Sequence, residues 1–320
     1  MNNYKNLIGM SEAAISQVQQ AAKIALEFRR TLQPSLQQAV NAINQVSRSI
    51  RTTIANSDIP AMMLKLAQGI QETEEDLKVF KAAIVDLGYP PHHELDIRLM
   101  REIARAYKAN GKDAVNEYID EFICKYYQPS LIQDIEKRWE KYKFLEKRLP
   151  LLRNAVKAHN LGMYELVVPS ILSQFEGIIV DAFGIKGKVN GKIQEILYET
   201  LLIKEGFTGG FHFEEEIHNY YSTKVLVGFH HGKKVKSEIS RHAILHGGDT
   251  NFGTQTSSLK VILLFDFIVE ALNEMEQETI HLGMQRVKDY RVEINKRNRI
   301  RKGNRKPNHK HHHTSRNDIK

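Results

Sequence analysis

The sequence predicts an all-α protein: a helical bundle with long helices at its N-terminus and a disordered basic tail at its C-terminus. Three observations predict this class. Apolar residues recur at steps of three and four, the spacing that places them on one face of a helix. Glycine and proline residues separate these periodic stretches. No pair of stretches shows the alternation of polar and apolar residues that is typical of paired β-strands.

The first region, residues 1–88, is predicted to form two or three long helices, with breaks at Pro34 and Pro60. The residues between its apolar positions are mostly Gln, Asn and Ser, which favours packing against itself or a partner over a charged coiled-coil surface. We therefore expect a structural, protein-interaction or sensor role for this region. The apolar positions are Leu36, Val40, Ile43, Ile50 and Ile54, then Met63, Leu66, Ile70, Leu77, Ile84 and Leu87.

The second region, residues 89–285, begins after the run Gly88-Tyr89-Pro90-Pro91. The glycine can end the preceding helix, and the paired prolines impose an extended link. Helical patterns then follow one another with short breaks, which predicts one helical domain. They lie at 94–108, 113–127, 130–147, 163–183, 190–205, 213–229, 237–246 and 257–283.

Basic residues concentrate in the last region, residues 286–320. The whole chain has a formal net charge of +8, but this region alone holds 13 Lys and Arg against three Asp and Glu, so the rest has a net charge of −2. Such a tail can gain salt-dependent affinity for a polyanion. A disordered terminus that only aids solubility is the alternative. The residues predicted to bind RNA are Arg297, Arg299, Arg301, Lys302, Arg305 and Lys306.

The composition argues against several classes of protein. The longest strongly apolar stretch, from Val261 to Ile268, is interrupted by Asp266 and is shorter than the roughly 20 residues of a membrane-spanning helix. The N-terminus has no hydrophobic signal core, so we expect a cytoplasmic protein that does not contact a membrane. The single cysteine, Cys124, cannot form an internal disulfide and is expected to pack in the core. Motifs of nucleotide triphosphatases and of acyl-transfer enzymes are not found.

Residues suited to phosphodiester chemistry gather in the segment from Ser240 to Leu264. Arg241, His242 and His246 precede Gly247-Gly248, which can end a helix, and a Thr-Ser-Ser run that can cap the next one. Arginine offers a fixed fork of donors to phosphate oxygens, and histidine transfers protons near neutral pH. Two other Arg–His pairs of similar spacing lack this frame: Arg153 with His159, and Arg305 with His311.

This segment resembles the HEPN superfamily, small all-helical domains whose nuclease members carry Arg, a polar residue, three variable residues and then His. Arg241, His242, Ala243-Ile244-Leu245 and His246 stand in that order. A second likeness lies upstream in KAHNLGMYELVVPSILSQFEGII, which includes Glu176 and is similar to the helix beside the motif in a group of bacterial HEPN-like proteins. With the run GGDTNFGTQTSSLKVILLFDF, the likeness covers about residues 90–280.

The resemblance implies a metal-independent endoribonuclease of the toxin or antiviral-defence type, as in abortive infection, with RNA as its substrate. In such a site His246 would be the general acid or base, and Arg241 would stabilise charge on the phosphoryl group, giving a 2′,3′-cyclic phosphate. His242 would be a second acid or base, or only a polar contact. Glu176 would orient Arg241 or a histidine, or serve as a structural partner.

On a continuous helix, Arg241 and His246 would lie about 140° apart around the axis. The two side chains can converge if the helix ends at Gly247 or if a two-fold homodimer joins two copies of the pair, and the homodimer is favoured. The alternative function is a non-catalytic HEPN-like module that binds a protein partner or RNA. An exposed cleft around the pair would favour the enzyme, and a buried, satisfied pair would favour the module.

Neither a metal site nor a cofactor is predicted. His212, Glu214 to Glu216 and His218 cluster near His230-His231. Their spacing provides neither the i,i+4 histidine pair of a helical zinc motif nor a cysteine ligand. An exposed helix start rich in glutamate is therefore expected at this position.

Overall fold

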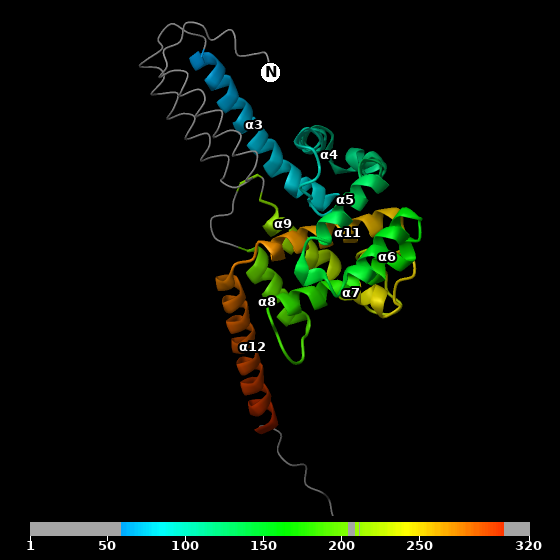
Figure 1. The fold of residues 1–320 in the computed structure, drawn as a ribbon, viewed down its shortest axis with the longest axis vertical. Coiled ribbons are helices and arrows are strands. Elements are labelled where there is room, and N and C mark those ends of the chain that lie inside the picture. Colours follow the sequence, from blue (N-terminus) through cyan, green and yellow to red (C-terminus); the bar gives the residue numbers. More distant parts are fainter. Residues whose placement is uncertain (1–58, 204–208, 211, 304–320) are drawn as a thin grey trace, which may run out of the picture.

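The computed structural model describes residues 59–203, 209–210 and 212–303, and these form helices and loops without a β-strand. Helices α4 to α11 form the body, from which α3 and α12 project (Figure 1). The predicted all-α class is confirmed. The helices are α3 (Ile59–Asp86), α4 (Ile97–Tyr126), α5 (Pro129–Trp139), α6 (Leu149–Asn160), α7 (Tyr164–Ala182), α8 (Gly191–Leu202), α9 (Glu214–Tyr220), α10 (Arg241–Leu245), α11 (Gln255–Asn273) and α12 (Gln277–Gly303), with short turns η2 (Lys143–Leu145) and η3 (Tyr221–Val225).

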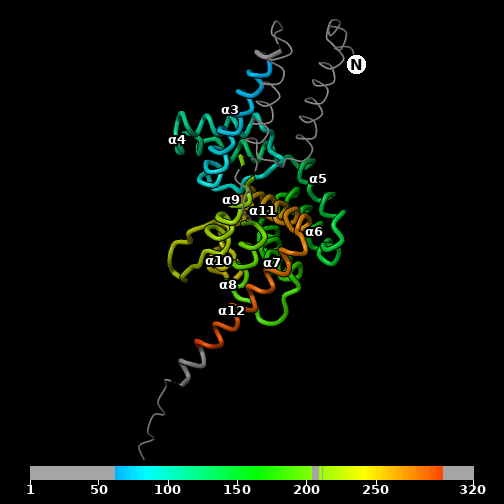
Figure 2. The backbone as a smooth tube through the Cα atoms, turned by 90° about the vertical axis from the view of Figure 1, so that its left-hand side faces the viewer, coloured from blue at the N-terminus to red at the C-terminus, as the bar shows by residue number. Residues whose placement is uncertain are grey.

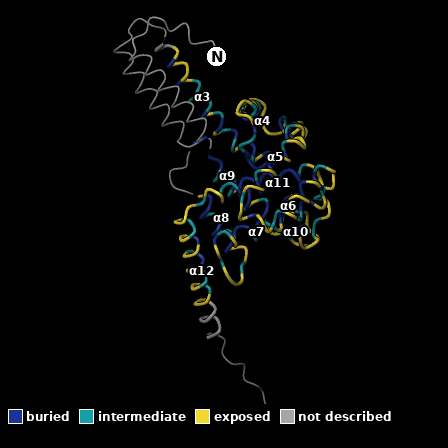
Figure 3. Tube along the Cα trace, viewed as in Figure 1, coloured by how far each residue is buried: buried dark blue, intermediate teal, exposed yellow. Residues whose placement is uncertain are grey.

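Helix α11 forms the centre of the body. Thr254 caps its start by accepting a hydrogen bond from the backbone N–H of Ser257 at 3.1 Å. Every residue from Ser257 to Val269 is buried, and α11 packs against α7 and also touches α4, α5, α6 and α8 (Figure 3). No helix within residues 59–203 and 212–303 is long and apolar enough to cross a membrane.

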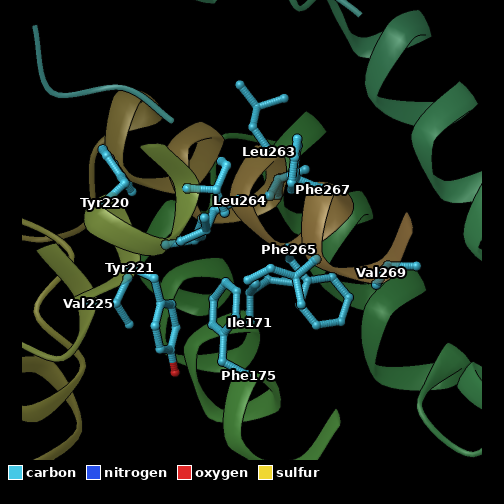
Figure 4. Close-up of a cluster of buried hydrophobic side chains, with 14 of the residues drawn as sticks. Ile171, Phe175, Tyr220, Tyr221, Val225, Leu263, Leu264, Phe265, Phe267 and Val269 are labelled. Atoms are coloured by element: carbon cyan, nitrogen blue, oxygen red, sulfur yellow. The ribbon is translucent and has the colours of Figure 1, made fainter. Parts of the chain in front are cut away.

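Aromatic rings join α7, η3 and α11 in the core (Figure 4). The ring centroid of Phe175 lies 5.6 Å from that of Phe265 and 5.5 Å from that of Tyr221. Tyr221 in turn lies 4.0 Å from Tyr198 of α8. Offset and edge-on aromatic pairs stabilise a core beyond the area they bury. These contacts fix the rotation of α7, and so fix where Glu176, the residue after Phe175, can lie.

One carboxylate, that of Asp266, lies within the apolar helix α11. Asp266 has no exposed surface, and its Oδ1 accepts a hydrogen bond from Trp139 Nε1 at 2.6 Å. Its Oδ2 lies 2.6 Å from Arg138 Nη2 and 3.0 Å from His92 Nε2. Burial alone would raise the pKa of Asp266, but the hydrogen bond to His92 and the charges of His92 and Arg138 hold it below its usual value. We call this group the Asp266 hub.

Some predicted helices differ from the observed ones near the start of the body. The patterns at 94–108 and 113–127 form the single helix α4, which is kinked at Gly111, where φ is 79°. The pattern at 130–147 covers α5 and the short turn η2. Helix α6 was not among the predicted helices. Its Pro150 lies in the first turn, where proline is well tolerated.

Some of the helices predicted after residue 163 also differ from the observed ones. The helices predicted at 163–183 and 190–205 correspond to α7 and α8, but the one at 213–229 ends at Val225. The pattern at 237–246 gives only the five-residue helix α10. The long pattern ending at residue 283 is divided into α11 and α12 by a break after Asn273.

Gly88 ends α3 as predicted, with a left-handed φ of 87°. The last turns of α3 nevertheless share the core of the body, because Leu77, Phe80 and Ile84 are buried and α3 packs on α4 and α9. The structure thus shows a helix end at this point, not the edge of a separate core. Residues 1–58, which hold most of the predicted N-terminal helices, lie outside the described residues.

The basic tail predicted from residue 286 begins as helix, because α12 continues to Gly303. Arg286 donates to Glu199 Oε2 on α8 at 2.7 Å, and the next residue, Val287, is buried in the core. These contacts anchor the helix despite the basic composition of this segment. Residues 304–320 lie outside the described residues.

Candidate functional site

Helix α10 carries the predicted motif at the edge of the body (Figure 2). Ser240 caps the helix, because its Oγ accepts from the backbone N–H of Ala243 at 3.3 Å, and the same hydroxyl donates to the carbonyl of Val227 at 3.0 Å. Gly247, with a φ of 69°, adopts the left-handed conformation that ends a helix. His246 is therefore the last residue before the chain turns away.

Two imidazole rings lie side by side on α10. The rings of His242 and His246 are parallel to within 2°, with centroids 6.2 Å apart, because residues four apart occupy neighbouring positions on a helix. His242 is partly buried, whereas His246 is exposed and its imidazole makes no hydrogen bond with the described residues. Burial, followed by the charges of Arg241 and His246, lowers the pKa of His242 below 6.5. His242 is therefore neutral near pH 7 and can accept a proton.

Arg241 contacts helix α7. Its Nη2 donates to Glu176 Oε2 at 2.8 Å, and only 17% of its side chain is exposed. The same carboxylate oxygen accepts from Gln194 Nε2 at 2.9 Å. The Nε of Arg241 is buried and has no hydrogen-bond partner in the part of the chain that the structure describes. Of the alternatives given for Glu176, the charge-assisted bond to Arg241 is present, and it holds the guanidinium in one place.

The four predicted catalytic residues thus lie in one area, but they differ in exposure. His246 is open to solvent, whereas Arg241 is mostly covered and paired with Glu176. Arg241 and His246 therefore differ: the imidazole of His246 is accessible to solvent, and the guanidinium of Arg241 is largely covered and paired.

A feature missed in the sequence lies directly before α10. We call residues 227–237 the lysine loop, because Lys233, Lys234 and Lys236 are exposed in it. With Val227, Gly228, Phe229 and His230, these lysines line a hollow of 420 Å³. Three lysines in four residues are a local sequence signal of an anion-binding segment.

Among the tail residues predicted to bind RNA, the structure describes the side chain of Arg297. Arg297 is exposed on α12 and pairs with Glu293 at 2.5 Å. The others either belong to the last turns of α12, where side chains are not described, or lie outside the described residues. The first group is Arg299, Arg301 and Lys302, and the second is Arg305 and Lys306.

The Asp266 hub was also missed, and it resembles a metal site. One possible ligand atom from each of His92, His93 and Asp266 lies within 4.8 Å of the others. However, the guanidinium of Arg138 donates to the same Asp266 oxygen that faces His92 and also lies 3.1 Å from Glu270. A metal cation would be repelled by this charge. The residues therefore fit an ion-pair network better than a metal centre.

The glutamate-rich segment that was weighed as a metal site starts helix α9. Glu214, Glu215 and Glu216 lie in its first turn, where acidic side chains favour the helix dipole. Only Glu215 is exposed, because Glu216 pairs with Lys81 at 3.1 Å and packs towards α3. Nδ1 of the buried His212 lies 3.7 Å from Glu214. The expected helix start is present, but it is less exposed than predicted.

Comparison of the chain with protein-family models, curated proteins and solved structures found no match. The likeness to the HEPN superfamily therefore rests on the order of residues in the motif and on the upstream segment.

Proposed function

We propose that this protein is a metal-independent endoribonuclease whose acid–base pair is His242 and His246. The observation that carries the proposal is the pair of parallel imidazoles, 6.2 Å apart, at the exposed edge of one chain. RNA cleavage by its own 2′-hydroxyl needs a base for the hydroxyl proton and an acid for the leaving oxygen. Imidazole performs both roles near neutral pH.

In the proposed reaction, neutral His242 accepts the proton of the ribose 2′-hydroxyl, and the 2′-oxygen attacks the adjacent phosphorus. The bond from phosphorus to the 5′-oxygen breaks, and His246 donates a proton to that oxygen. The products are a 2′,3′-cyclic phosphate and a 5′-hydroxyl end. Arg241 stabilises the charge that develops on the phosphoryl oxygens, and Glu176 positions Arg241.

The proposal accords with the likeness to HEPN nucleases, and it includes a cytoplasmic toxin or antiviral-defence role with a trigger sensed through the N-terminal helices. Because one chain holds both imidazoles, the acid–base pair itself does not require a second copy. A homodimer would bring a second set of Arg241 and His246 to the same RNA.

One observation favours a second candidate, a non-catalytic module that binds a protein partner or RNA. Arg241 is linked through Glu176 to Gln194, which lies 3.4 Å from the hydroxyl of the buried Tyr221. A side chain tied into the core in this way contributes to packing whether or not it contributes to catalysis.

The deciding experiment is an RNA cleavage assay in EDTA, with end-group analysis of the products. We expect His246→Ala to lower the rate by about 10²- to 10⁴-fold, the usual contribution of general acid–base catalysis. His281→Ala is the matched control, because His281 is exposed on α12. Circular dichroism shows whether each variant is folded. Unchanged cleavage by His246→Ala would refute the assignment, and a folded wild type inactive on every RNA would favour the binding module.

Glu176→Gln tests the positioning role separately. The charge of Glu176 raises the pKa of His242, so removing that charge lowers this pKa further. The rate should fall, and the acidic limb of the pH–rate profile should move to lower pH. A shift of this limb would show that the charge of Glu176 acts on His242, an effect that loss of packing alone would not produce.

A further inference from the structure

We infer that the lysine loop binds the phosphates of an RNA strand on the side of the His242 and His246 pair. This inference rests on the proposed function in that it takes RNA as the ligand of this face. It adds a substrate-binding surface on a segment that the motif does not include.

The charge of the loop is uncompensated. Lys233, Lys234 and Lys236 form no ion pair with the described residues. The first acidic residue after them, Glu238, is occupied elsewhere: Lys260 donates to its Oε1 at 2.5 Å and the hydroxyl of Ser257 to its Oε2 at 3.1 Å. Three positive charges therefore face solvent within four residues.

The hollow beside the loop has room for a nucleotide. Its 420 Å³ hollow falls within the range of about 300–1,000 Å³ that is typical of small-molecule sites. A turn shapes it, because Gly232 has a φ of 78° and the backbone N–H of Lys233 donates to the carbonyl of His230 at 3.1 Å. The ring of Phe229 lies in the wall, 4.8 Å from that of His231, so ring surfaces suited to base stacking accompany the lysines.

Two contacts fix the loop to α10, the helix that carries His242, and to the turn that follows His246. The hydroxyl of Ser240, which caps α10, donates to the carbonyl of Val227 at the start of the loop. The ring of Phe229 packs on Gly248 so closely that a Cβ there would stand 2.1 Å from a ring carbon. Because Gly248 is two residues from His246, we expect a strand held by the lysines to pass beside the imidazoles.

The choice of lysine indicates what kind of recognition to expect. Lysine is a compact point charge on a flexible stem, so it neutralises phosphate without reading base sequence. Each phosphate contact on a single strand contributes about 0.7 to the slope of log affinity against log salt. Removing three lysines should therefore reduce the magnitude of this slope by about 2, and weaken binding in low salt by roughly tenfold to a hundredfold.

The test measures binding of the full chain to a fluorescent, fully 2′-O-methylated oligoribonucleotide by anisotropy at several salt concentrations. The variant combines Lys233→Ala, Lys234→Ala and Lys236→Ala. The matched control, with the same loss of charge, replaces three exposed lysines that form no ion pair with described residues: Lys108→Ala, Lys125→Ala and Lys141→Ala. We expect the smaller slope and weaker binding for the loop variant, and a nearly unchanged slope for the control.

Equal losses in the two variants, or none in either, would overturn the inference. A 4-thiouridine oligonucleotide adds a positional readout, since photo-crosslinks should map to residues 228–236. The methylated probe cannot be cleaved, so binding is judged independently of catalysis. Loop-dependent binding without any cleavage of ordinary RNA would keep the inference and refute the nuclease proposal, whereas His246-dependent cleavage with unchanged binding of the loop variant would do the reverse.

Discussion

Replacing His159 by asparagine should flatten the dependence of folding stability on pH below neutrality. His159 is only 6% exposed, its Nδ1 lies 2.7 Å from the hydroxyl of Ser258, and its ring packs edge-on against Tyr164. Burial lowers its pKa to about 4, because a charged imidazole would lose its hydration there. Folding thus keeps this side chain neutral over a range of pH in which the unfolded chain protonates it.

The sign and size of the effect follow from this shift. The unfolded pKa is about 6.5, so between pH 6.5 and the folded pKa the unfolded state binds one more proton than the folded state. Stability therefore falls as the pH falls through this interval, by about 1.4 kcal/mol for each pH unit. The contribution amounts to about 2 kcal/mol at pH 5 and about 3 kcal/mol at pH 4.

The assay is urea unfolding of wild type and His159→Asn at pH 7, 6 and 5. Asparagine offers an amide near the position of Nδ1 and does not titrate. The smaller side chain also leaves a cavity, so the informative quantity is the change in unfolding free energy between pH 7 and pH 5. Wild type should lose about 2 kcal/mol more than the variant. The exposed control His281→Asn should follow wild type, and parallel curves for wild type and His159→Asn would refute the reasoning.

Two further substitutions test contacts near the site and in the core. Asp266→Asn should lower the free energy of unfolding by about 1.5–3 kcal/mol, because Arg138 and His92 lose the charged acceptor that they share, while Glu270 still pairs with Arg138. Urea unfolding measures this loss, with the exposed Asp289→Asn as the control, and a loss below about 1 kcal/mol would contradict the role of the hub. Gly248→Ala should destabilise the fold by about 1–3 kcal/mol through its clash with Phe229, and Phe229→Ala in the same chain should recover part of that loss. Strictly additive losses would show that the two residues are not in contact.

Periodicity predicted the helices whose apolar residues face a large core. The segments that became α7 and α11 are examples, since Val167, Ile171 and Phe175 are all buried. Local sequence patterns did not predict helices that contain proline or many charged residues. Helix α6, with Pro150 in its first turn, was not among the predicted helices, and the tail predicted to be disordered from residue 286 begins as a helix that Arg286 anchors.

The site was accessible to sequence reasoning only in part. The link between Glu176 and Arg241 was anticipated through the HEPN resemblance, because no local pattern connects residues 65 positions apart. The sequence contains only one sign of the Asp266 hub, a charged residue within an apolar run. The partners of Asp266 lie 127 to 174 residues away along the chain. Such contacts are created by tertiary packing and have no periodic signature.

Helix α11 is surrounded by apolar side chains, and apolar surfaces of this kind tolerate more than one rotational setting. Turning it by one residue, about 100°, would leave buried polar groups without partners, at a cost of several kcal/mol. The polar residues of α11 therefore favour a single rotational orientation, the one in which each has its partner. These residues and their partners are Ser258 with His159, Lys260 with Glu238, and Asp266 with Arg138. Because Glu238 directly follows the lysine loop, we expect the orientation of the central helix to set where that loop ends.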